Sequence, residues 1–120
     1  MAKVEKRIVM VVEDDHLIRQ VIAEALEEEG FEVVEAANGK EALEALKQVH
    51  PSLILLDLMM PVMNGWEFRR TQLADPSISD IPVVVLSALK DHTVEAERSF
   101  TKPFDLEDLL DTVWDFAGAP

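Results

Sequence analysis

Short, continuous apolar runs that end at polar residues constrain the fold of this chain more than any other feature. Residues 53–56 are Leu-Ile-Leu-Leu and lead directly into Asp57, and residues 8–12 and 83–86 are apolar in the same way. Runs of this length predict strands that are buried on both faces, as in a parallel sheet covered by helices. We therefore expect Asp57 at the carboxyl edge of such a sheet, where open α/β folds bind ligands.

Helical periodicity fills the intervals between these runs. Apolar side chains recur at helical spacing in four stretches, residues 18–26, 42–49, 66–73 and 106–114. The predicted strands cover residues 7–12, 31–36, 53–56, 81–86 and 99–101. We expect Gly30 to end the first helix, Asn38 to begin the second and Asp105 to begin the last. Strand–helix alternation repeated in this way predicts a doubly wound α/β fold with a mostly parallel sheet.

One interval departs from the pattern. Residues 89–98 contain one strongly apolar position, Val94, among mainly polar and charged side chains. A helix so short and polar gains little from docking on a sheet. We expect a shortened or irregular fourth helix here, of one or two turns at most.

Composition narrows the class of protein. The 120 residues suffice for a single domain, which we expect to span residues 1–120. A net charge of −13 disfavours binding to nucleic acid, which needs a basic surface. The chain has no cysteine, no apolar run long enough to cross a bilayer and no signal-peptide pattern. We therefore expect a cytoplasmic protein with no membrane partner.

Polar groups follow four of the predicted strands and should meet at one edge of the sheet. They are Glu13 with Asp14, Asp57, Ser87 and Lys102. Three carboxylates at one place suit a hard cation such as Mg²⁺, which would also relieve their repulsion. A phosphoryl group delivered to Asp57 would meet the cation, the lysine ammonium and the serine hydroxyl, which is the arrangement that phosphoryl transfer needs.

Each of these residues has a simpler structural interpretation when it is taken alone. Asp57 and Ser87 could be turn residues, the acids at positions 13–15 could favour a helix N-terminus, and Lys102 could be a surface side chain. The occurrence of all of them at successive strand ends indicates a phosphoryl-transfer site much more specifically than any one of them does.

The sequence resembles the receiver domain of two-component response regulators. The matching segments are residues 11–15, 55–65, 82–88 and 101–104, in the family's order and across the whole chain. The resemblance implies a flavodoxin-like, five-stranded parallel sheet. It also implies that Asp57 accepts a phosphoryl group from a histidine kinase or a histidine phosphotransfer protein, as a signalling phosphoacceptor and not an enzyme.

The resemblance also assigns roles to individual residues. Asp14 and Asp57 would bind Mg²⁺ directly, Met59 would contribute its backbone carbonyl, and Glu13 would act through water. Ser87 would match the switch hydroxyl of the family and Lys102 its phosphate-pairing lysine. Asp15 lies one position beyond the acidic pair and is left out of the site.

Two departures from the family fall on its usual output surface. The interval from Ser87 to Lys102 is shorter than usual by roughly two helical turns, and Ser99 stands where the family commonly has an aromatic residue. We expect phosphorylation to act through an order change in residues 88–98. The downstream target is unknown. If the sequence is complete, no effector domain is present, and we then expect output by protein contact or phosphate relay and not by DNA binding.

Three other classes of protein fit the sequence less well. A pseudo-receiver that binds partners without phosphorylation usually lacks the acceptor, an acid or the lysine, and none is missing here. A haloacid-dehalogenase phosphatase needs a second Asp two residues after the nucleophile, where this chain has Met59. A dinucleotide-binding unit is disfavoured because no G-x-G-x-x-G follows a strand.

Overall fold

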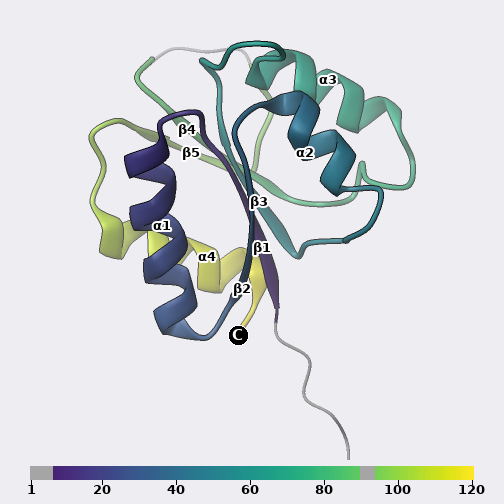
Figure 1. Cartoon of the computed structure of the whole chain (residues 1–120). Helices are drawn as coiled ribbons and strands as arrows, with labels where there is room; N and C mark the ends of the chain where they lie inside the picture. The colour runs from purple at the N-terminus through teal and green to yellow at the C-terminus, as the bar shows by residue number, and fades with distance from the viewer. Residues whose placement is uncertain (1–6, 90–93) are drawn as a thin grey trace, which may run out of the picture.

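The computed structural model describes residues 7–89 and 94–120, which form a five-stranded parallel sheet between two helical layers (Figure 1). The strands are β1 (Ile8–Val12), β2 (Glu32–Ala36), β3 (Leu53–Asp57), β4 (Val83–Ser87) and β5 (Arg98–Thr101). Their order is β2-β1-β3-β4-β5, and every neighbouring pair is parallel. The order reverses direction beside β1, which makes a crevice at the carboxyl ends of β1 and β3. The predicted flavodoxin-like fold is therefore confirmed.

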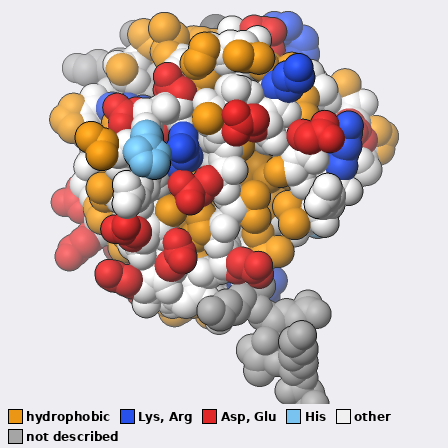
Figure 2. Space-filling model, viewed as in Figure 1, with side chains coloured by type: hydrophobic (Ala, Val, Ile, Leu, Met, Phe, Trp, Pro, Cys, Tyr) orange, Lys and Arg blue, Asp and Glu red, His pale blue; other side chains and the backbone are white. Residues whose placement is uncertain are grey.

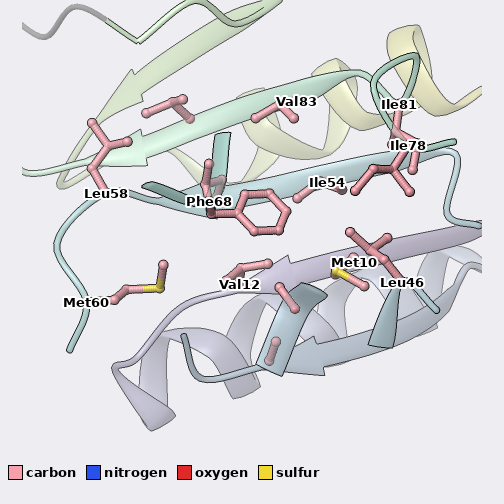
Figure 3. Close-up of a cluster of buried hydrophobic side chains, with 14 residues drawn as sticks. Met10, Val12, Leu46, Ile54, Leu58, Met60, Phe68, Ile78, Ile81 and Val83 are labelled. Atoms are coloured by element: carbon pink, nitrogen blue, oxygen red, sulfur yellow. The ribbon is translucent and has the colours of Figure 1, made fainter. Parts of the chain in front are cut away.

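Helices cover both faces of this sheet. The helices α1 (His16–Glu29) and α4 (Leu106–Ala117) lie on one face, and α2 (Gly39–Ala45) and α3 (Gly65–Ala74) lie on the other (Figure 1). Two apolar clusters result, because alternate strand residues point to opposite faces. On the α2–α3 face, Phe68 packs among side chains such as Val12 and Ile54 (Figure 3). The central strands are buried on both faces, as their continuous apolar runs predicted.

Helix ends follow the capping residues expected from the sequence. Gly30 has a left-handed backbone with φ of 106° and ends α1, while the Asn38 side chain accepts from the Glu41 amide to begin α2. Asp105 caps α4 through the amides of its first turn. Asp15, which the sequence analysis left out of the site, caps α1 by accepting from the amides of residues 17 and 18. These bonds satisfy backbone groups that have no partner inside the helix.

The helix α2 is shorter than the sequence analysis predicted, so that prediction of its end is wrong. Apolar side chains continue to Val49, but the α-helix ends at Ala45. The amides of Lys47 and Gln48 bond to carbonyls three residues earlier, so the last turn tightens toward a 3₁₀ geometry. Helical spacing of apolar residues does not distinguish such a turn from a further α-helical turn.

The shortened interval after β4 contains no helix among its described residues. Ala88, Leu89 and residues 94–97 are irregular, and residues 90–93 of the predicted short helix lie outside the described residues. The side chains of Val94 and Ala96 pack against the apolar cluster on the α2–α3 face. The segment therefore covers part of the sheet as irregular chain. The expected order change involves residues 90–93 and stays a prediction.

Acidic side chains dominate the charge of the surface. Figure 2 shows Asp and Glu side chains scattered over one face of the molecule, with fewer basic side chains and with apolar side chains between them. This distribution agrees with the net charge of −13. No helix in the described part of the chain is long and apolar enough to cross a membrane.

Candidate functional site

The carboxyl ends of four strands bring the predicted site residues to one edge of the sheet. Glu13 follows β1, Asp57 is the last residue of β3, Ser87 is the last residue of β4 and Lys102 follows β5. The strands are in parallel register, with Asp57 opposite Leu86 and Ser87 opposite Thr101. The sheet alone therefore places acid, hydroxyl and ammonium groups along one edge.

Three carboxyl groups form the centre of this site. One oxygen each of Glu13, Asp14 and Asp57 lies within 4.8 Å of the others. Glu13 and Asp57 are buried, at 0% and 3% exposure, whereas Asp14 is exposed to solvent. The site therefore has two buried acids and one acid that faces water.

Lys102 supplies the positive charge beside these acids. Its Nζ lies 2.7 Å from Glu13 Oε1 and 3.6 Å from Asp57 Oδ1. Its backbone amide donates to the Ser87 carbonyl at 2.7 Å, which extends the β4–β5 ladder into the site. The peptide bond to Pro103 is cis. A single ammonium balances one of the three carboxylates, so the cluster carries a formal charge of −2.

Burial and mutual repulsion change how the acids titrate. Burial, with a smaller contribution from Asp57, raises the pKa of Glu13 to about 7, although Lys102 opposes the change. Burial also raises the pKa of Asp57 above 3.8, against the hydrogen bonds and the lysine charge that favour its ionised form. Loss of water makes the charged form of a carboxyl costly unless a cation compensates for it.

The geometry fits a divalent cation. Glu13 Oε2 is buried and has no hydrogen-bond partner within residues 7–89 and 94–120. A buried carboxylate oxygen without a partner is costly, and a hard cation or its bound water satisfies such an atom. Three carboxylates in an oxygen-rich site with an excess of negative charge are the donor set that Mg²⁺ prefers.

The loop after β3 shapes the open side of the site. Asp14 and Met59 line a hollow of about 340 Å³ together with residues of this loop. The Met59 amide donates to Asp57 Oδ1 at a long 3.4 Å. Gly65 lets the loop close against the strand, because a Cβ there would lie 2.5 Å from the Asp57 carbonyl oxygen. The loop thus places the Met59 backbone beside the acids.

The Ser87 hydroxyl is buried and engaged locally. The Ser87 side chain is 1% exposed, and its Oγ accepts from the Leu89 amide at 3.0 Å. The bond keeps Leu89 folded over the end of β4. Ser87 lies at the expected sheet edge, although its hydroxyl makes no hydrogen bond to the acids among the described residues.

Arg19 is a contributor to the site that the sequence analysis missed. Its guanidinium donates to the Glu13 carbonyl at 2.8 Å and contacts the Glu35 carboxylate at 3.2 Å. This arginine ties the turn that carries Glu13 and Asp14 to α1 and β2. The available signal was a basic residue in the second turn of a helix that begins at an acidic turn, which is too common a pattern to be specific.

The fold and the acids at the ends of β1 and β3 define a doubly wound α/β protein with a candidate cation site. Sequence comparison identifies the family. Residues 9–114 match the sequence model of the response regulator receiver domain. The chain belongs to this family. Receiver domains act in two-component signalling as phosphoacceptors and are not conventional enzymes.

Curated relatives agree with this assignment. Response regulator RR06 of Streptococcus pneumoniae is 40% identical over 105 residues, which cover 82% of this chain and 47% of that protein. The DNA-binding response regulator MtrA of Mycobacterium leprae is 36% identical over 110 residues, covering 85% of this chain and 47% of that protein. The chain thus spans about half the length of these relatives.

Solved structures share the whole fold. The chemotaxis response regulator CheY4 of Vibrio cholerae superimposes with a TM-score of 0.85 at 30% identity, covering 93% of this chain and 99% of that one. The response regulator TrrA of Thermotoga maritima, solved with Mg²⁺ and beryllofluoride, gives a TM-score of 0.81 at 28% identity, covering 92% and 98% of the two chains.

Proposed function

We propose that residues 1–120 form one receiver domain in which Asp57 is the phosphoacceptor. A single observation carries the proposal: the Asp57 carboxylate lies at the end of a buried strand, within 4.8 Å of oxygens of Glu13 and Asp14 and 3.6 Å from the Lys102 ammonium. In the transfer, an Asp57 carboxylate oxygen attacks phosphorus while the bond from phosphorus to a donor histidine nitrogen breaks. The product is an aspartyl phosphate and a free histidine.

The other site residues are assigned by position. Asp14 and Asp57 would hold Mg²⁺ directly with the Met59 carbonyl, and Glu13 would act through water. The bound ion would supply charge neutralisation for the phosphoryl oxygens. The Lys102 ammonium would pair with a phosphoryl oxygen in exchange for one of its carboxylate contacts. Ser87 would donate its hydroxyl once the bond from the Leu89 amide rearranges.

The partners follow from the chemistry. We propose a histidine kinase or a histidine phosphotransfer protein as the donor and a protein target for the output. A cytoplasmic location and independence from nucleic acid stay predictions. The relative MtrA is a DNA-binding response regulator, and the present chain covers 47% of it.

Intact mass spectrometry tests the proposal. Wild type incubated with acetyl phosphate and Mg²⁺ should gain one phosphoryl group, and Asp57→Asn should gain none. Omission of Mg²⁺ should abolish the gain in wild type. A protein that folds but never gains the group under these conditions would instead be a pseudo-receiver.

A further inference from the structure

The strand that carries Lys102 into the site is poorly defined by its own sequence. β5 has four residues at the edge of the sheet, and Phe100 is the only one of them that is even partly buried. Strand register is specified mainly by burial of one face, so a short, polar edge strand specifies it weakly. Contacts outside β5 are therefore needed to fix the position of Lys102.

Lys102 tolerates little displacement. Its Nζ contacts Glu13 at 2.7 Å and Asp57 at 3.6 Å. A strand advances by about 3.3 Å per residue, so a slip of one residue would move Lys102 by as much as these contact distances. The slip would also reverse the faces of the strand and expose Phe100.

Glu97 fixes the start of this strand by a two-point contact with one residue of β4. The Glu97 amide donates to the Val83 carbonyl at 3.0 Å, and Glu97 Oε2 accepts from the Val83 amide at 2.6 Å. The contact stands one position before the pairing of Val84 with Arg98. Val83 is fully buried, so its amide would be left unsatisfied without this carboxylate.

Arg69 holds the same segment from α3. Its Nε donates to the Glu95 carbonyl at 2.9 Å, and its Nη1 donates to Gln72 Oε1 at 2.8 Å. Gln72 is itself fixed, because its amide donates to the carbonyls of Ile78 and Ile81 at 3.0 Å. Arg69 is 7% exposed and Gln72 is fully buried. This buried polar network ties Glu95, two residues before Glu97, to α3 and to the loop that leads into β4.

We infer that Glu97 and Arg69 are positioning residues for Lys102: they set the register of β5 on β4 and so place the ammonium on the acidic cluster. The inference rests on the proposed role of Lys102 in phosphoryl transfer. The four residues of β5, Arg98–Thr101, connect the Glu97 contact to the bond between the Lys102 amide and the Ser87 carbonyl at the site.

Phosphorylation rates with acetyl phosphate and Mg²⁺ test the inference. Glu97→Ala should slow the gain of the phosphoryl group by tenfold or more, since a misplacement of about 1 Å can cost roughly a hundredfold in rate. Glu97→Gln keeps an oxygen for the Val83 amide and should stay near the wild-type rate. Arg69→Met should also slow the reaction.

Matched controls lie next to each changed residue. Glu95→Ala removes an exposed carboxylate of the same segment and keeps the carbonyl that Arg69 uses, so it should react at the wild-type rate. Arg70→Met removes the exposed neighbour of Arg69 and should also be silent. These controls separate the effect of losing a specific contact from the effect of losing a charge on the same segment.

A double-mutant cycle distinguishes positioning from a general structural role. In a Lys102→Ala background, Glu97→Ala should cause no further loss, because the group that it positions is gone. An equal fold loss in both backgrounds, or a wild-type rate for Glu97→Ala, would overturn the inference.

A structural measurement keeps this test separate from the proposed function. Nuclear Overhauser contacts between β4 and β5 should show Leu86 opposite Phe100 in wild type. These contacts should weaken or double in Glu97→Ala while contacts between β1 and β3 persist. An unchanged pattern of β4–β5 contacts in Glu97→Ala would refute the inference, whether or not wild type gains a phosphoryl group. Failure of wild type to gain the group would refute only the proposed function.

Discussion

Replacement of the phosphoacceptor by its neutral isostere should stabilise the protein when no divalent cation is present. Asp57 faces two carboxylates within 4.8 Å and one ammonium at 3.6 Å. At an effective dielectric constant of about 20, the repulsion of Asp57 by each of Glu13 and Asp14 costs about 3.5 kcal/mol, and its attraction to Lys102 contributes about 4.6 kcal/mol of stabilisation. The net repulsion is about 2 kcal/mol, so Asp57→Asn should raise the free energy of unfolding by about this amount.

The sign of the pH dependence follows from the raised pKa values. Burial raises the pKa of both Asp57 and Glu13 in the folded protein, that of Glu13 from 4.5 to about 7. The folded state therefore holds these protons more tightly than the unfolded state, and stability is lost as pH rises through the raised values. The gain in free energy of unfolding from Asp57→Asn should be small near pH 5 and should reach its full size near pH 8.

Urea unfolding followed by circular dichroism measures the effect. With EDTA at pH 8, Asp57→Asn should unfold at a higher urea concentration than wild type. Asp111→Asn, on the exposed side of α4, is the matched control and should change little. Mg²⁺ at a hundredfold excess over its dissociation constant should stabilise wild type by about 2.7 kcal/mol, and the variant by much less. Equal or lower stability of Asp57→Asn in EDTA would refute this electrostatic account.

Three further changes have defined outcomes. Asp14→Ala should weaken Mg²⁺ binding at least tenfold in a calorimetric titration, because too few hard oxygens remain; unchanged affinity would remove Asp14 from the site. Met59 and Leu89 stand two positions after Asp57 and Ser87, beside the expected path of an attacking water, and neither offers a group to orient it. Met59→Asn or Met59→Glu should therefore speed loss of the phosphoryl group; an unchanged or slower rate would count against this. Val62 has φ of 68° in a turn closed by the Met63 amide and the Pro61 carbonyl at 2.7 Å. Val62→Gly should raise the free energy of unfolding by about 1 kcal/mol, because a β-branched residue is strained there, and a decrease would show that the strain is absent.

Much of the fold could be predicted because its strands are buried on both faces. Their apolar runs ended close to the observed ends of β1, β3 and β4, and the polar residue at each end marked the site edge. Parallel topology then placed Glu13, Asp57 and Lys102 together without further information. Short-range signals such as the Asn38 and Asp105 caps were equally visible, since their bonds span three residues or fewer.

The parts that escaped prediction depend on contacts between distant residues. Arg69 was placed on a predicted helix, but its bond to the Glu95 carbonyl joins residues 26 positions apart. The Glu97 carboxylate replaces a backbone partner for Val83, and no local pattern indicates such a role. Arg19 acts on a nearer group, the Glu13 carbonyl six positions earlier, across a turn whose geometry the sequence does not specify. Side chains that bond to backbone amides or carbonyls leave no periodic signal in the sequence.

The most direct test of the central claim is chemical localisation of the phosphoryl group. Protein treated with acetyl phosphate and Mg²⁺ is reduced with borohydride, which converts an aspartyl phosphate to homoserine, and its peptides are then sequenced by mass spectrometry. The account predicts homoserine at position 57 and unmodified acids at Glu13 and Asp14. Homoserine at another aspartate, or the same labelling in Asp57→Asn, would contradict it.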